Sequence, residues 1–110
     1  MNYRHETLAA GRWTEFSLME QLANVGSEVE RTLNWRGKNN AELGRRAFER
    51  ALELLELTIA DPRHRRRLRE LTRTREALLD FFLGDNQFQS TEQAWRKYFL
   101  GFGLAARRNK

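Results

Sequence analysis

The chain has 110 residues, the size of one domain, with a formal net charge of +5 and 32% charged residues. It contains no cysteine, which excludes disulfides and thiolate metal sites and suits a reducing cytoplasm. No segment resembles a signal peptide, and the longest apolar stretch, ALLDFFL, is interrupted by Asp80 and too short to cross a bilayer. A single proline and few β-branched residues favour helices over sheets. We therefore expect one cytoplasmic, all-α domain without membrane contact.

A capping box begins the first expected helix. Ser17 stands three residues before Glu20, the spacing at which each side chain accepts a hydrogen bond from the other residue's backbone amide. Apolar residues then recur on one helical face: Leu18, Leu22, Val25, Val29 and Leu33. Gly26 lies beside this face and predicts a close contact with another helix. The helix is expected to end near Gly37.

Two further helices follow with a short turn between them. Asn39 or Asn40 caps the second helix, whose apolar residues cover more than half of its circumference, so we expect it to be the most buried. Asp61 as N-cap and Pro62 at the first helical position predict an immediate start of a third helix, which ends at Gly84. The third helix is expected to bury one face: Leu68, Leu71, Leu78, Leu79 and Phe82.

A fourth helix is expected after the loop GDNQFQS, where Ser90 and Gln93 repeat the capping-box spacing. Its core residues are Ala94, Trp95, Tyr98, Phe99, Phe102 and Ala106. Four amphipathic helices with short connections predict an antiparallel up-down-up-down four-helix bundle in residues 17–110.

Residues 1–16 precede these helices as an N-terminal extension. They carry several apolar side chains: Tyr3, Leu8, Trp13 and Phe16. We expect part of this segment to lie across the bundle or on a neighbouring subunit.

Positive charge is concentrated in the later half of the chain. Residues 1–61 contain eight Lys and Arg against ten Asp and Glu, whereas residues 62–110 contain twelve against five. Seven arginines fall within residues 61–75. On a helical wheel, four of them form an exposed stripe: Arg65, Arg66, Arg69 and Arg73. Arg63 and Arg67 lie on its flank. Near the C-terminus, Arg107 and Arg108 extend the basic surface, and with Arg63 and the stripe they are the candidate contacts to nucleic acid.

Such a surface favours a polyanion partner. The chain has 17 arginines and 3 lysines, and arginine suits bidentate contacts to phosphate. A GC-rich genome would give the same excess. No motif for base-specific recognition is present, so we expect contacts to phosphates.

A structural role for the arginines is the alternative. Glu53, Glu56 and Asp61 end the second helix just before the arginines begin, and the two clusters would neutralise each other across the turn. Arg75 falls inside the apolar face, where it must meet a carboxylate or extend to the surface. The third helix supplies three acids of its own: Glu70, Glu76 and Asp80. Because seven arginines exceed these partners, we expect a surplus of positive charge to remain.

No motif indicates catalysis. His5 and His64 are the only histidines and lie far apart in the sequence, so we expect no metal site and no other cofactor. His64 is expected to be a structural residue. No Ser-His-Asp grouping, phosphate loop or glycine fingerprint is visible, so we expect that the protein is not an enzyme. An enzyme would need a closed pocket formed by folding and lined by Arg75, His64 and a carboxylate.

A second set of apolar residues lies off the expected core faces: Trp35, Phe88, Leu100 and Leu104. Either residues 1–16 cover them, or they form a subunit interface or a partner site. The partner site is the basis of an alternative function, a protein–protein interaction adaptor or small regulatory subunit that does not bind nucleic acid.

The four amphipathic helices, the arginine excess and the basic C-terminal AARRNK resemble small bacterial four-helix-bundle proteins. These are the accessory variability determinant of diversity-generating retroelements and its relatives encoded in ribosomal-RNA intervening sequences. The blocks AFERALELLELTIADP and REALLDFFLGDN are also similar to small proteins from reverse-transcriptase neighbourhoods. The resemblance covers residues 17–110 and carries no motif from which a functional residue is transferred.

The resemblance implies a basic homo-oligomer that binds structured RNA and a reverse transcriptase. Together with the charge pattern, it leads us to expect a non-enzymatic helical bundle that binds nucleic acid, RNA in preference to DNA. We expect the protein to act as a homo-oligomer and as an accessory to a reverse transcriptase.

Overall fold

The computed structural model describes residues 11–108. Over these residues the chain forms helices and no β-strand, which confirms the prediction of an all-α fold. After a helical turn at residues 11–13, the elements are α2 (Leu18–Gly37), α3 (Ala41–Ala60), the 3-10 helix η1 (Pro62–Arg67), α4 (Leu68–Leu83) and α5 (Glu92–Arg108). No helix in this part of the chain is long and apolar enough to cross a membrane.

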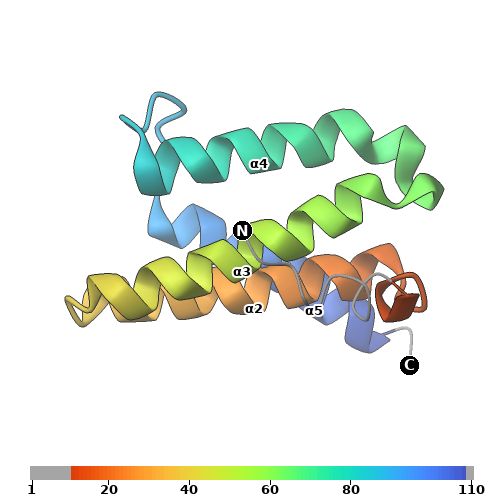
Figure 1. The fold of residues 1–110 in the computed structure, drawn as a ribbon, viewed down its shortest axis with the longest axis horizontal. Coiled ribbons are helices and arrows are strands. Elements are labelled where there is room, and N and C mark those ends of the chain that lie inside the picture. The colour runs from red at the N-terminus through yellow and green to blue at the C-terminus, as the bar shows by residue number, and fades with distance from the viewer. Residues whose placement is uncertain (1–10, 109–110) are drawn as a thin grey trace.

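α2 is the central helix. α2 contacts both α3 and α5. In Figure 1, α5 passes behind α3 and α2, while α4 lies beyond α3 as a separate layer. The predicted core residues of α2 are buried: Leu22, Val25, Val29 and Leu33. The expectation that α3 would be the most buried helix is wrong. Because α5 does not cover α3, apolar residues such as Leu54 and Leu57 remain only half-buried.

Local capping explains where the first two helices begin. The predicted capping box of α2 is present: the Ser17 amide donates to Glu20 Oε1 at 2.9 Å, and the Glu20 amide donates to Ser17 Oγ at 3.2 Å. Asn40 caps α3 by accepting a hydrogen bond from the Leu43 amide at 3.1 Å. Both signals were readable from residue spacing alone.

The start of α5 differs from its prediction by one residue. Thr91, and not Ser90, is the cap, since Thr91 Oγ1 accepts a hydrogen bond from the Ala94 amide at 3.0 Å. Ser90 instead belongs to the preceding loop, where its amide donates to Asn86 Oδ1 at 2.8 Å. Ser90, which the capping-box spacing predicted as the cap of α5, therefore stabilises the loop before it.

The connection between α3 and α4 also differs from its prediction. Pro62 begins a 3-10 helix rather than an α-helix, and His64 has non-helical angles within it (φ −105°, ψ 24°). A 3-10 helix has three residues per turn, so a wheel drawn at 100° per residue from Pro62 misplaces the residues after this segment. Leu68, expected in the core, is 42% exposed, whereas His64 is buried. Further along α4, Leu71 and Leu78 are buried as expected.

α2 and α5 approach each other closely at Gly26. A Cβ built on Gly26 would lie 2.6 Å from Phe99 Cβ, closer than two such atoms approach in proteins. Phe99 Cβ is fixed to the α5 backbone, so it cannot move aside cheaply. The sequence prediction of a close helix contact at Gly26 is confirmed.

We expect Gly26→Ala to destabilise the fold by about 1–3 kcal/mol, because the added methyl group forces α2 and α5 apart. Thermal and urea unfolding followed by circular dichroism would measure the loss. Gly101→Ala in α5 is the matched control, since a Cβ there meets no atom within 4 Å and alanine favours helix by about 1 kcal/mol. Equal stability of the two variants would contradict the close contact.

Candidate nucleic-acid interface

The seven arginines of residues 61–75 fall into a paired group and an unpaired group. Three form ion pairs: Arg63 with Asp61 at 2.7 Å, Arg67 with Glu70 at 2.7 Å, and Arg75 with Glu56 at 3.0 Å. No acid among residues 11–108 lies within ion-pair distance of the other four: Arg65, Arg66, Arg69 and Arg73. The acids at the end of α3 therefore neutralise part of the charge and leave a surplus.

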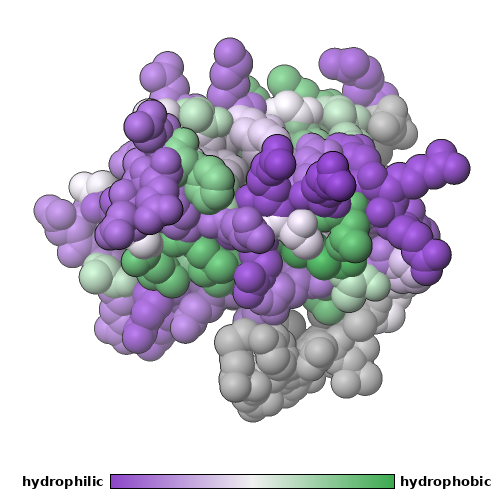
Figure 2. Space-filling view, turned by 90° about the horizontal axis from the view of Figure 1, so that it is seen from above, coloured by the Kyte–Doolittle hydropathy of each residue, from purple (hydrophilic) through white to green (hydrophobic). Residues whose placement is uncertain are grey.

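We call these four residues the arginine ridge. Arg65 and Arg66 belong to η1, Arg69 and Arg73 belong to α4, and all four are exposed. Arg69 and Arg73 are four residues apart in an α-helix, so they share one face. Figure 2, which views the molecule from the α4 side, shows strongly hydrophilic side chains projecting from this surface.

The remaining predicted contacts are not part of the ridge. The Arg63 guanidinium donates to Asp61 Oδ2 at 2.7 Å and to the Phe16 carbonyl at 2.8 Å, so it is held at the turn. Arg107 and Arg108 are exposed at the end of α5, which in Figure 1 lies on the other side of α2 and α3 from η1. The structure does not join these two residues to the ridge.

A buried polar network beneath η1 holds this turn in place. The Asp61 side chain is 1% exposed, and its carboxylate accepts hydrogen bonds from the Arg63 amide at 3.0 Å and from Gln21 Nε2 at 3.1 Å. The Arg63 guanidinium, bound to the carboxylate, holds the pKa of Asp61 well below its usual range. Asp61 is therefore ionised wherever the protein is folded near neutral pH.

The same network ties residues 11–16 to the helices. Gln21 Nε2 donates to the Trp13 carbonyl at 2.7 Å, and Trp13 Nε1 donates to Thr58 Oγ1 at 3.1 Å. Trp13 is buried, so this part of the N-terminal extension packs against the helices. The predictions for His5, Tyr3 and Leu8 lie outside the described residues.

His64 is a structural member of this network. Its Nε2 lies 2.8 Å from Gln21 Oε1 and 3.4 Å from Asp61 Oδ2. Gln21 Nε2 already faces two acceptors, so its Oε1 is the acceptor here and His64 Nε2 carries a proton. Burial lowers the pKa of His64, against the attraction of Asp61. Arg75 binds Glu56 instead, so the structure does not gather His64 and Arg75 around one pocket.

Gln21 was missed as a structural residue, although its position carried a signal. It stands three residues after Leu18 and four before Val25, which places it on the apolar face of α2. A glutamine on such a face needs buried hydrogen-bond partners. The sequence gives no sign that these partners are Asp61 and His64, because they are about forty residues away.

The four apolar interface candidates do not form one surface. Trp35 is half-buried beside Gly44 of α3, and Lys38 Nζ lies 5.2 Å from the centre of its ring. Phe88, Leu100 and Leu104 are exposed. Phe88 lies in the loop between α4 and α5, whereas Leu100 and Leu104 lie on α5.

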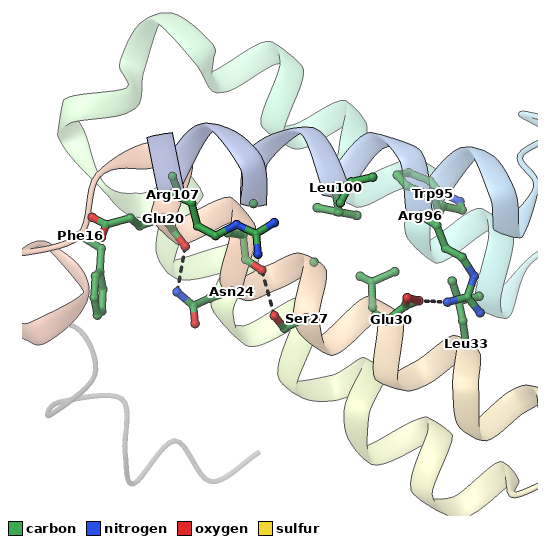
Figure 3. A pocket seen from close by; sticks show the side chains of 16 residues that line it. Phe16, Glu20, Asn24, Ser27, Glu30, Leu33, Trp95, Arg96, Leu100 and Arg107 are labelled. Carbon is green, nitrogen blue, oxygen red and sulfur yellow. Dashed lines mark hydrogen bonds and ion pairs between the residues drawn. The ribbon is translucent and has the colours of Figure 1, made fainter. Parts of the chain in front are cut away.

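Leu100 lines a groove of about 560 Å³ between α2 and α5. Figure 3 shows Leu100 above the middle of this groove, with Arg107 toward one end and the ion pair between Arg96 and Glu30 toward the other. The groove thus has an apolar centre with charged residues near its ends.

No protein-family model, curated protein or solved structure matches the chain.

We expect the stability of the protein to fall as the pH is lowered moderately below 6.5, the ordinary pKa of histidine. The pKa of His64 is lower in the folded state than its ordinary value of 6.5, so the unfolded chain binds more protons below that pH. Asp61 is ionised in both states in this range and adds no slope. His64→Gln keeps an amide donor for Gln21 and should reduce the slope in melting curves recorded by circular dichroism. His5 remains in both proteins, so equal slopes would contradict the assignment to His64.

Proposed function

We propose that the protein binds RNA through the arginine ridge and does not catalyse a reaction. One observation carries this proposal: four exposed guanidinium groups on consecutive elements have no ion-pair partner among residues 11–108. Each guanidinium offers planar paired donors that match a phosphate, which a lysine does not. The proposed preference for RNA over DNA rests on the sequence resemblance.

The position of the ridge supports an anionic partner. α4 begins directly after η1, and Arg67 at its N-cap provides no capping hydrogen bond from its side chain. The positive end of the helix dipole therefore lies beside several arginines, with Glu70 as the acid of the first turn, already paired with Arg67. A bound phosphate would add favourable negative charge there.

The helices carry the ridge on one side of the molecule. We propose that α2, α3, α4 and α5 form the antiparallel up-down-up-down bundle expected from the sequence, in the cytoplasm. The homo-oligomeric state and the reverse transcriptase partner rest on the resemblance alone. Exposed Leu100 and Leu104 supply an apolar surface on which a second copy or such a partner would pack.

The same apolar surface supports the alternative function. Leu100 is 56% exposed beside the groove between α2 and α5, which suits a protein–protein interaction adaptor. In that case the arginines of the ridge are only hydrated surface residues, and the protein does not bind RNA at moderate ionic strength.

The quadruple variant Arg65, Arg66, Arg69 and Arg73 to Gln is expected to lose RNA binding, because it removes the unpaired guanidinium groups. Fluorescence anisotropy with a labelled single-stranded RNA would measure the affinity, and circular dichroism should show an unchanged helix content and melting temperature. With about four phosphates neutralised, the wild-type protein should show a slope of log affinity against log salt of about −3.

A control variant removes the same charge from another surface: Arg31, Arg45, Arg46 and Arg50 to Gln, four exposed residues of α2 and α3. It should bind RNA with nearly the wild-type affinity at moderate salt. If both quadruple variants lose affinity equally, binding depends on net charge alone and the ridge is not the site.

A further inference from the structure

A pocket of about 330 Å³ lies between α4 and the start of α5. This volume is in the range of sites that take a small organic group. α4, the following loop and α5 all line it: Glu70, Arg73, Thr74 and Ala77; Ser90; Ala94, Trp95 and Tyr98. Arg73 thus belongs both to the ridge and to the lining of the pocket.

Trp95 and Tyr98 form the aromatic side of this pocket. Their ring centres are 5.9 Å apart and the planes are almost perpendicular, at 88°. Trp95 is 7% exposed, and its Nε1 is buried without a hydrogen-bond partner among the described residues. Because this atom is itself not exposed, Trp95 offers the pocket its ring and not its N–H.

The polar edge of the pocket is fixed by a link between α4 and α5. Thr74 Oγ1 donates to the Glu70 carbonyl at 2.9 Å, so Tyr98 donates its hydroxyl proton to Thr74 Oγ1 at 3.1 Å. This bond holds the Tyr98 side chain at the pocket. Burial raises the pKa of Tyr98, so its hydroxyl remains neutral at physiological pH.

Arg73 gives the pocket a cationic edge. It is exposed, it has no ion pair among the described residues, and it follows Arg69 by one helical turn. A flat group that is linked to an anion matches this combination of aromatic walls and adjacent guanidinium groups. A nucleobase attached to its sugar-phosphate chain has these properties. Glu70 also lines the pocket, and its carboxylate is paired with Arg67.

We propose that the pocket between α4 and α5 binds one unstacked base of a single-stranded RNA, whose neighbouring phosphates bind Arg69 and Arg73. This inference rests on the proposed function and specifies how the strand is held. The base packs against the rings of Tyr98 and Trp95. Every base has an aromatic face, so the pocket binds a base without selecting its identity. A base paired within a duplex cannot enter.

The test compares two labelled strands on the intact wild-type protein by fluorescence anisotropy. One is a ten-residue uridine RNA, and the other is the same sugar-phosphate chain without bases. We expect the strand without bases to bind about tenfold more weakly, the loss typical of one stacked base. Equal affinity for the two strands overturns the pocket proposal and leaves the ridge proposal standing. If neither strand binds at moderate salt, the proposed function fails as well.

A variant that fills the pocket gives an independent readout. Ala94 is exposed at its edge, so Ala94→Phe should block the pocket without disturbing the core, which an unchanged melting temperature would verify. We expect this variant to lose about tenfold in affinity for the uridine strand and to bind both strands equally. Ala41→Phe, at an exposed alanine that begins α3, is the matched control and should keep the wild-type preference.

Discussion

The buried carboxylate of Asp61 is the interaction on which the arrangement of the other elements depends. It caps η1 through the Arg63 amide, binds the Arg63 guanidinium and accepts a hydrogen bond from Gln21 of α2. A buried charge is stable only when it is paired and hydrogen-bonded, and Asp61 meets both conditions. Since η1 leads directly into α4, this carboxylate also sets where α4 begins and which arginines remain outside.

Local signals in the sequence predicted most of the helices. The Ser17 and Glu20 capping box, the Asn40 cap and the close contact at Gly26 depend on residues near in sequence or on side-chain size, and they are present in the structure. The position of Leu68 was wrong for a different reason. The residues PRHRRR contain no signal that indicates a 3-10 helix. A helical wheel drawn through such a segment assigns the residues after it to the wrong face.

The candidate site was predictable in charge but not in shape. Counting acids near residues 61–75 indicated that some arginines would lack partners, and Arg65, Arg66, Arg69 and Arg73 do lack them among the described residues. The pocket beside Arg73 was not predictable. Trp95 and Tyr98 have the spacing of ordinary core residues, and only the positions of two helices distant in sequence reveal the space between them. Arg63 shows the converse, because its hydrogen-bond partners include the Phe16 carbonyl, which no pattern of charges indicates.

The sparse burial of α4 has a consequence for motion. α4 buries three residues, Leu71, Thr74 and Leu78, whereas α2 buries seven. Segments with little buried surface open more readily than the rest of a fold, and their backbone amides exchange hydrogen with solvent through such partial openings. The helix that carries half of the ridge is therefore the one whose amides gain most protection when its cationic face is occupied. The rigidity of α4 then depends on the bound partner as well as on the contacts within the protein.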